Sequence, residues 1–353
     1  MYSKRFSRLS PYTPGEQPKD RKFIKLNTNE TPYPPSPEIR ELLIRFQTEE
    51  LRLYPDPDAS ALPEAIGEVE GVSPSQIFPS NGSDEALSFC FFSFFDEDAG
   101  PVLYPSFTYS FYPVYCSFYG IPFSTIPLRP DFSLNFDKFI EAVPGSSGVI
   151  FPNPNAPTGR YEELEKITPF LCAAGREHAV VIDEAYIDFG GETAIPLITT
   201  HPNLVVVKTL SKGFSLAGVR LGYTVAREET TTALFTVKDS FNSYPIDRLT
   251  QQIGIAAFRN MAYYKELQRK IIETRGTTEE ELTALGWEVL PSKANFLFAR
   301  KEGTAGSEIY SILREHGILV RHFSTPGIED FIRISIGTET EMEQFLDICR
   351  QYI

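Results

Sequence analysis

Ionisable side chains follow two neighbouring apolar runs of the chain, at the point where each run ends. Asp183 closes the run AVVID (179–183), and Lys212 comes shortly after the next run, LVVVK (204–208). Ligands of parallel α/β sheets bind beyond the carboxyl ends of the strands, so we expect both side chains in one cleft. A carboxylate there needs a cationic partner, and a lysine of depressed pKa can form a Schiff base with a carbonyl group.

Aspartate and lysine together are the pair that pyridoxal phosphate requires. The aspartate keeps the pyridine nitrogen protonated, so that the ring acts as an electron sink, and the lysine tethers the aldehyde. Ser211 and Arg220 add a hydroxyl and a guanidinium for the cofactor's phosphate. The turn SNGSDE (80–85) opens a helix whose backbone N–H groups suit the same phosphate. Each of these motifs alone is more often structural, but their joint order favours a cofactor site.

Short apolar runs alternate with helical patterns over the first two thirds of the chain. Continuous apolar strands separated by helices have both faces covered, which predicts an α/β domain with a largely parallel sheet flanked by helices. The predicted strands are PVLY (101–104), GVIF (148–151), AVVID (179–183), LVVVK (204–208) and LGYTVA (221–226).

Changes in composition and hydrophobic pattern along the chain predict three regions. Residues 1–37 carry seven prolines, which deny the segment helix interiors and ladder hydrogen bonds, so we expect an extended arm that leans on another part of the molecule. Residues 38–250 form the predicted large, cofactor-binding domain. Residues 251–353 form a predicted smaller α+β domain, hinged to the first by a long amphipathic stretch from Arg248 to Leu285.

Composition restricts the class of protein. The 353 residues include 33 basic and 47 acidic side chains, and the resulting charge of −14 argues against a nucleic-acid partner. The four cysteines are not spaced like the ligands of a metal site, and we expect them to be free thiols in a reducing compartment. No N-terminal apolar segment or membrane-length apolar run occurs, so we expect a cytoplasmic protein without a membrane partner and without a metal.

The chain resembles the fold-type I pyridoxal-phosphate aminotransferases and, within them, the histidinol-phosphate aminotransferases. That resemblance implies a large domain with a mostly parallel sheet of the seven-stranded type, a smaller α+β C-terminal domain, and a homodimer with shared active sites. It runs nearly end to end, through LNTNETPYP (26–34), LYPDP (53–57), SNGSDEAL (80–87), YPSF (104–107), NPNAPTG (153–159), DEAY (183–186), TLSKGFSLAGVRLG (209–222), SKANFLF (292–298) and FIRISIGT (331–338).

The resemblance also implies roles around the cofactor. Lys212 would form the Schiff base and then move the substrate's α-proton, Asp183 would pair with the pyridinium, and Tyr186 would bind the ring hydroxyl. Phe107 would stack on the ring. The remaining implied cofactor contacts are Asn155 at the ring hydroxyl, Tyr54 reaching the phosphate from the other subunit, and Gly82, Ser83, Asp84, Ser211 and Arg220 around the phosphate.

Substrate contacts follow from the same resemblance. Arg333 would bind the anionic end of the substrate, and Arg321, Tyr12 and Asn29 are further candidates for that pocket. The sequence departs from the family at Ala156, where an asparagine usually precedes Pro-Thr-Gly, so the role at the ring hydroxyl is assigned to the neighbouring Asn155. The segment TYSFYPVYCSFYG (108–120) is also unusually aromatic, and either packs as a loop or forms a pocket for an aromatic amino acid.

The implied reaction transfers an amino group between L-histidinol phosphate and 2-oxoglutarate, giving imidazole-acetol phosphate and L-glutamate. Two alternatives share the motifs: an aromatic amino acid aminotransferase and a phosphothreonine decarboxylase. A dinucleotide enzyme lacks support because no GxGxxG follows the first strand, and a pure binding protein would be expected to lose Lys212.

Overall fold

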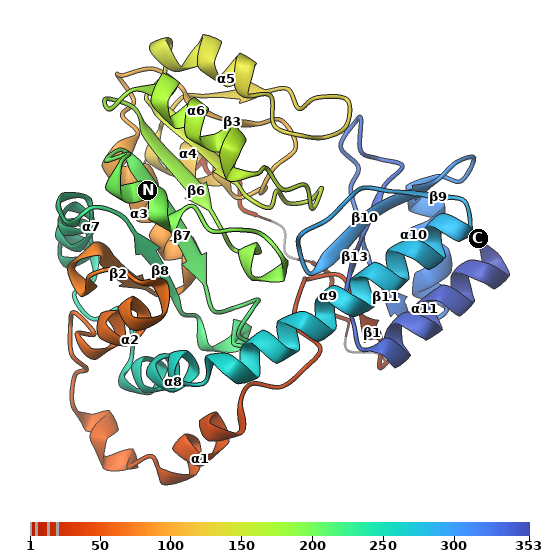
Figure 1. The fold of residues 1–353 in the computed structure, drawn as a ribbon, viewed down its shortest axis with the longest axis horizontal. Coiled ribbons are helices and arrows are strands. Elements are labelled where there is room, and N and C mark those ends of the chain that lie inside the picture. Colours follow the sequence, from red (N-terminus) through yellow and green to blue (C-terminus); the bar gives the residue numbers. More distant parts are fainter. Residues whose placement is uncertain (1, 4–5, 13–14, 19–20) are drawn as a thin grey trace.

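A computed structural model describes residues 2–3, 6–12, 15–18 and 21–353. Within them, a large α/β part carries a seven-stranded sheet, and a smaller part carries a four-stranded antiparallel sheet and a two-stranded one (Figure 1). The α/β fold class with a second, smaller α+β part is therefore confirmed. No helix in the described ranges combines the length and the apolar character that a membrane crossing requires.

The seven-stranded sheet is parallel except for one strand. β8 runs antiparallel to both of its neighbours, because it returns directly from β7 through the loop that carries Lys212, without a crossover helix. The five predicted strands are present, and β2 and β4 are additional. In spatial order the strands are β2 (Ile77–Ser80), β8 (Gly222–Val225), β7 (Leu204–Thr209), β6 (Ala179–Asp183), β5 (Gly148–Pro152), β3 (Val102–Pro105) and β4 (Phe123–Ile126).

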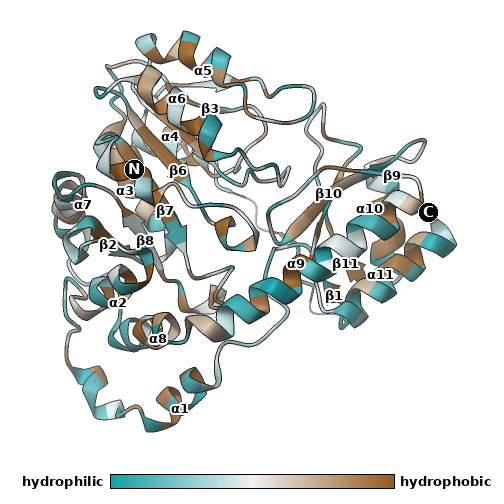
Figure 2. Ribbon diagram, in the orientation of Figure 1, coloured by the Kyte–Doolittle hydropathy of each residue, from teal (hydrophilic) through white to brown (hydrophobic). Residues whose placement is uncertain are grey.

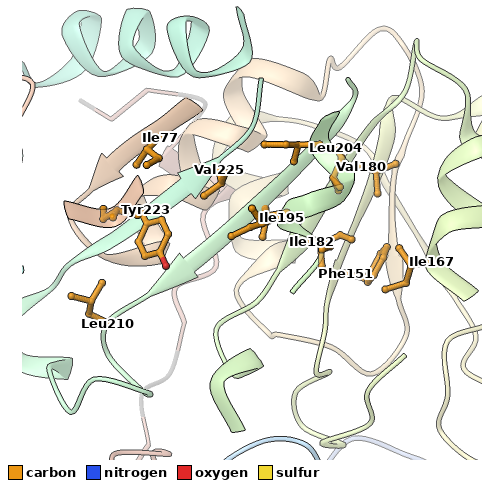
Figure 3. Packing of buried hydrophobic residues seen from close by; sticks show 14 of the residues in the cluster. Ile77, Phe151, Ile167, Val180, Ile182, Ile195, Leu204, Leu210, Tyr223 and Val225 are labelled. Carbon is orange, nitrogen blue, oxygen red and sulfur yellow. The ribbon is translucent and has the colours of Figure 1, made fainter. Parts of the chain in front are cut away.

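Helices cover both faces of this sheet, which explains why its strands are apolar throughout. On β6, Val180 and Ile182 belong to one buried cluster and Val181 to the cluster on the other face. Figure 3 shows the first cluster, in which Phe151 of β5 lies beside Ile167 of α6 and side chains of several other strands extend the same layer. The helices that contribute most of its members are α2 (Ala61–Glu70), α5 (Phe136–Ala142), α6 (Leu164–Ala174) and α8 (Arg248–Arg259). The second cluster uses α3 (Gly82–Phe94), α4 (Tyr112–Tyr119) and α7 (Glu228–Phe241).

The amphipathic stretch predicted as one helix forms two. α8 ends at Arg259, and α9 (Met261–Ala284) begins after Asn260, which has a non-helical backbone conformation. α9 runs from the large part to the smaller one (Figure 1), and polar and apolar residues alternate along it (Figure 2). The domain boundaries stay a prediction. α1 (Pro37–Arg45) lies at the margin of the molecule, at the lower edge of Figure 1.

The smaller part includes a piece of the proline-rich N-terminal segment. β1 (Ile24–Lys25) pairs in parallel with β11 (Ile318–Leu319), so the prediction that this segment lacks ladder hydrogen bonds is wrong there. The flanking prolines stand at positions 18 and 32, which leaves the amides of residues 24–26 free to pair. The antiparallel sheet has the order β12 (Arg321–His322), β13 (Ile332–Ser335), β10 (Phe296–Lys301), β9 (Trp287–Val289), with α10 (Gly306–Glu315) and α11 (Glu339–Tyr352) beside it.

Candidate active site

A cavity of about 740 Å³ lies between the carboxyl ends of the parallel strands and the smaller part. It brings together most of the residues predicted from the sequence, although these come from opposite ends of the chain. The predicted residues that line it are Tyr12, Asn29, Ser83, Asp84, Phe107, Asp183, Tyr186, Ser211, Lys212, Arg220, Arg321 and Arg333. Gly82, Asn155 and Tyr54 are not part of its lining.

Asp183 ends β6 as a buried carboxylate, only 4% exposed. Its Oδ1 accepts a 3.1 Å hydrogen bond from the backbone N–H of Ala185, and its Oδ2 accepts one of 3.2 Å from the hydroxyl of Tyr112. Burial raises the pKa of Asp183 to about 6. No lysine, arginine or histidine of the described ranges forms a salt bridge with it. A buried carboxylate of this kind suits a cationic ring nitrogen in the cavity.

Lys212 is held at both ends by the segment LNTNETPYP. Its Nζ donates a 3.1 Å hydrogen bond to the carbonyl of Thr28, and its own carbonyl accepts a 2.5 Å hydrogen bond from Thr31 Oγ1. Burial, and then the positive charge of Arg333, lower the pKa of Lys212 to about 8. About a tenth of this lysine is therefore a neutral, nucleophilic amine at pH 7, far more than for an ordinary lysine with a pKa of 10.5.

The N-terminus of α3 forms an anion cradle. Asn81 makes no side-chain cap, so the first N–H groups of the helix are left for a ligand. Gly82 has φ +76°, and a Cβ there would lie 2.8 Å from Nη2 of Arg220. Arg220 in turn binds Asp84 at 2.9 Å. Glycine at 82 thus allows the guanidinium to approach the cradle, which fits a phosphate group.

Two arginines lie at the small-domain side of the cavity. Arg321 of β12 and Arg333 of β13 are directly paired in the antiparallel ladder. Nη2 of Arg333 donates 3.1 Å to the carbonyl of Asn27, whereas its buried Nε has no partner among the described residues. Burial and the charge of Arg321 lower the pKa of Arg333. Two adjacent guanidinium groups with an unused donor suit an anionic substrate group.

Tyr12 and Asn29 complete this end of the cavity. Tyr12 packs against Phe111, with ring centroids 5.3 Å apart. The side-chain amide of Asn29 is already bonded to the hydroxyl of Tyr186.

Aromatic side chains around the cavity differ in what they touch. Phe107 packs toward the smaller part, against Phe132, with ring centroids 6.2 Å apart. Tyr109, which the sequence interpretation left within an unusually aromatic segment, also lines the cavity and donates 3.0 Å to Oδ1 of Asp84. Its ring lies 5.7 Å from that of Tyr112, the partner of Asp183. Tyr109 is therefore next to both the phosphate cradle and the buried carboxylate.

Asn155 and Tyr54 lie outside the cavity of their own chain. Asn155 is buried, and its Nδ2 donates to the carbonyl of Phe107 and to Thr158, each at 2.9 Å. The neighbouring Ala156 lines the cavity instead. Tyr54 is 78% exposed and stacks on Tyr244, with ring centroids 4.7 Å apart.

These features fit pyridoxal phosphate. The buried Asp183 lacks a cation, Lys212 is a primary amine of lowered pKa, and the uncapped α3 N-terminus with Arg220 suits a phosphate. The three features face one cavity, as the cofactor's ring nitrogen, aldehyde and phosphate require.

Comparison with known proteins agrees with this geometry. The family model for aminotransferase class I and II matches residues 21–348. The chain is 53% identical over 348 residues to the histidinol-phosphate aminotransferase of Syntrophus aciditrophicus, covering 98% of this chain and 96% of that protein. It is 45% identical over 353 residues to that of Clostridium acetobutylicum, covering 100% and 99% of the two chains.

A solved structure of a histidinol-phosphate aminotransferase has the same fold as this chain. The histidinol-phosphate aminotransferase of Sinorhizobium meliloti, crystallised in complex with pyridoxal-5'-phosphate, matches with a TM-score of 0.84 at 26% identity, covering 94% of this chain and 93% of that one. An L-threonine-O-3-phosphate decarboxylase from Porphyromonas gingivalis matches at 0.77 and 21% identity, a likeness that shows the fold alone. The chain belongs to the class I and II aminotransferases and, within them, to the histidinol-phosphate aminotransferases.

Proposed function

We propose that this protein is a pyridoxal-phosphate-dependent transaminase that interconverts L-histidinol phosphate and 2-oxoglutarate with imidazole-acetol phosphate and L-glutamate. The observation that carries the proposal is the cavity itself. It combines the buried carboxylate of Asp183 and the amine of Lys212 with two arginines at the opposite end. The identity of the substrate is inferred from relatives named histidinol-phosphate aminotransferases, which are 45–53% identical to this chain over nearly its whole length.

The cofactor, when bound, supplies an aldehyde that takes the amino group and a ring that accepts the electron pair of the broken Cα–H bond. Asp183 would hold the ring nitrogen protonated, and the hydroxyl of Tyr186 would hydrogen-bond the ring's hydroxyl group. The N–H groups at the start of α3, with Ser211 and Arg220, bind the phosphate.

Lys212 moves the proton. With the cofactor bound, its Nζ would take up and hold the proton from the substrate's Cα, a role that requires a pKa near the working pH. The lowered pKa of about 8 supports this role. The bonds from Thr28 and Thr31 hold the lysine at both ends and limit the directions in which its amine can point.

Arg333 and Arg321 bind the anionic ends of the two substrates. Histidinol phosphate carries a phosphate and glutamate carries carboxylates, and one pair of guanidinium groups can receive either. The unpartnered Nε of Arg333 supports this assignment. Tyr12 packs at the same end of the cavity and contributes to its wall.

Tyr109, rather than Phe107, is the better candidate for stacking on the cofactor ring. Its contacts with Asp84 and with Tyr112 put it beside both groups that hold the cofactor. Phe107 belongs to an aromatic cluster of the smaller part, which supports a role in the substrate wall. For Asn155, whose Nδ2 donates to Phe107 and Thr158 while its buried Oδ1 has no partner among the described residues, we propose a role in shaping the turn before Ala156.

The active enzyme is a homodimer with shared sites. Leu43 and Ile44 of α1, together with Leu51, Leu53 and Tyr54, are exposed on one stretch of chain. An exposed apolar set of this kind suits a protein interface. From that stretch, Tyr54 reaches the phosphate cradle of the partner. Four free cysteines support a cytoplasmic enzyme.

The test is an amino-donor comparison on the enzyme saturated with pyridoxal phosphate. L-Histidinol phosphate, L-phenylalanine and O-phospho-L-threonine are each supplied with 2-oxoglutarate, and both L-glutamate and carbon dioxide are measured. We expect glutamate formation with a kcat/KM that is far higher for histidinol phosphate. Preference for phenylalanine would make the protein an aromatic aminotransferase, and carbon dioxide without glutamate from phosphothreonine would make it a decarboxylase.

A further inference from the structure

Asp183 has one side-chain hydrogen-bond donor in the described structure, and it comes from the aromatic segment 108–120. We propose that Tyr112 is a positioning residue for Asp183: its hydroxyl orients the carboxylate toward the cavity and so maintains the contact with the cofactor's ring nitrogen. The inference rests on the proposed function only in requiring pyridoxal phosphate in the cavity.

Each oxygen of the Asp183 carboxylate accepts one hydrogen bond from a different donor. The hydroxyl of Tyr112 binds Oδ2 at 3.2 Å and the backbone N–H of Ala185 binds Oδ1 at 3.1 Å. One donor on each oxygen fixes the rotation of the carboxylate about χ2, which is otherwise broad for aspartate. The remaining lone pairs then point in a defined direction.

Tyr112 is itself held rigidly. It is the first residue of α4, is fully buried, and is followed by Pro113 at the start of that helix. Its ring packs against Phe91, Tyr104 and Tyr109, with centroids 5.7 to 6.1 Å apart. Loss of the hydroxyl alone therefore leaves the ring in place. The aromatic segment thus acts as a support for Asp183 as well as a wall of the cavity.

The titratable groups that face Asp183 in the described structure are neutral or acidic. The titratable groups that face it are Asp84 and Cys90 of α3, Tyr109, Tyr112 and Tyr115 of the aromatic segment, and Tyr186. None of these is a cation. Burial raises the pKa of the Tyr112 hydroxyl well above its ordinary value, so it remains a donor over the working pH range.

The experiment compares Tyr112→Phe with Tyr264→Phe. Tyr264 is a matched control for burial and for the loss of one hydroxyl contact: it is also fully buried, and its hydroxyl accepts a 3.2 Å hydrogen bond from the backbone N–H of Ser36, away from the cavity. Affinity of the apoenzyme for pyridoxal phosphate is measured at pH 8 and pH 6. Ring-nitrogen protonation is measured at pH 8 from the ¹⁵N shift of labelled cofactor.

We expect Tyr112→Phe to weaken cofactor affinity roughly tenfold at pH 8, the scale of a hydrogen bond to a charged group, and to lower the protonated fraction of the ring nitrogen. The loss should be larger at pH 6, because removing a donor raises the pKa of Asp183 further and neutralises the carboxylate at a higher pH. Tyr264→Phe should retain wild-type affinity and a wild-type ¹⁵N shift.

A double variant separates positioning from packing. In an Asp183→Asn background, Tyr112→Phe should cause little further loss of affinity, because the tyrosine acts through the carboxylate. Equal losses in both backgrounds, or a wild-type ¹⁵N shift in Tyr112→Phe, would overturn the proposal. Failure of the wild-type enzyme to transaminate histidinol phosphate would instead overturn the proposed function, and leaves these binding measurements intact.

Discussion

Asn29 donates a 3.0 Å hydrogen bond from its side-chain amide to the hydroxyl of Tyr186, 157 positions later in the chain. The amide oxygen of Asn29 accepts a 2.8 Å hydrogen bond from Ser335 Oγ, and its backbone N–H donates to the same hydroxyl at 2.8 Å. Asn29 therefore connects the end of β6 in the large part to β13 in the smaller one. It occupies a left-handed backbone conformation with φ +55°, which asparagine tolerates better than most residues.

Replacing Asn29 should lower activity through Tyr186. Asn29→Gly removes the amide but keeps the backbone conformation, and we expect kcat to fall roughly tenfold, the scale of one or two buried hydrogen bonds. Asn29→Ala removes the same amide and adds left-handed strain, which costs about 1 kcal/mol. The two variants should have the same kcat. In urea denaturation, the alanine variant should be less stable than the glycine variant. Wild-type turnover in the glycine variant would exclude this role for Asn29.

Lys212→Ala should retain the cofactor but lose turnover by several orders of magnitude. Asp183, Arg220 and the start of α3 still bind the ring and the phosphate, whereas no amine remains to move the proton. Equilibrium dialysis of the cofactor and a transamination assay measure the two effects separately. Lys138→Ala, an exposed lysine, is the control and should match the wild type. Substantial turnover by Lys212→Ala would mean that another residue moves the proton.

Covalent attachment of pyridoxal phosphate to the apoenzyme should depend on pH through Lys212. Burial disfavours the ammonium form and lowers its pKa from 10.5 to about 8, so the reactive amine accumulates as pH rises to that value. We expect the attachment rate constant to rise about tenfold per pH unit below pH 8 and to level off above it. Stopped-flow absorbance between pH 6 and pH 10 measures the profile. A rate that keeps rising to pH 10 would indicate an ordinary, solvated lysine.

Asp183→Asn should stabilise the apoenzyme at pH 8 while it weakens cofactor binding. Burial raises the pKa of Asp183 from 3.8 to about 6, so the ionised carboxylate destabilises the folded apoenzyme by up to about 3 kcal/mol above that pH. The penalty disappears as pH falls from 6 to 4, because the carboxyl group is then protonated in the folded state. The midpoint of urea unfolding should therefore exceed that of the wild type at pH 8 and approach it at pH 4.

An exposed aspartate provides the control for that measurement. Asp98→Asn should leave the urea midpoint unchanged at both pH values, because Asp98 lies at the surface. A midpoint for Asp183→Asn below that of the wild type at pH 8 would show that the carboxylate is stabilised in the apoenzyme by an interaction other than those described.

We expect Tyr54→Ala, like Lys212→Ala, to lose activity, and mixing the two variants should restore activity if Tyr54 acts across a dimer. In a heterodimer of Lys212→Ala and Tyr54→Ala, one site combines an intact Lys212 with an intact Tyr54 from the partner subunit, and the other site has neither. Random reassortment makes half of the dimers mixed, each with one intact site, so about a quarter of wild-type activity should return. No recovery after verified subunit exchange would mean that Tyr54 serves its own chain. A monomer by light scattering would exclude the homodimer.

The residues that end each strand were predictable from the sequence. A buried strand appears as a continuous apolar run, and the ligand edge of a parallel sheet follows its last residue, so local pattern alone identified Asp183, Lys212 and the helix start at 82–85. The resemblance to the aminotransferases added Arg321 and Arg333, which no local pattern marks and which the cavity brings together with Lys212.

Tertiary structure alone decided which side chains meet across the fold. Whether Ala156 or Asn155 faces the cavity depends on the local course of the backbone through the turn, and the pairing of β1 with β11 joins segments nearly 300 positions apart. Tyr109 and Tyr112 look alike within an aromatic segment, yet one binds Asp84 and the other Asp183, because α4 packs across α3 and the end of β6. Such contacts depend on the packing of distant elements, which composition and periodicity do not encode at the level of single side chains.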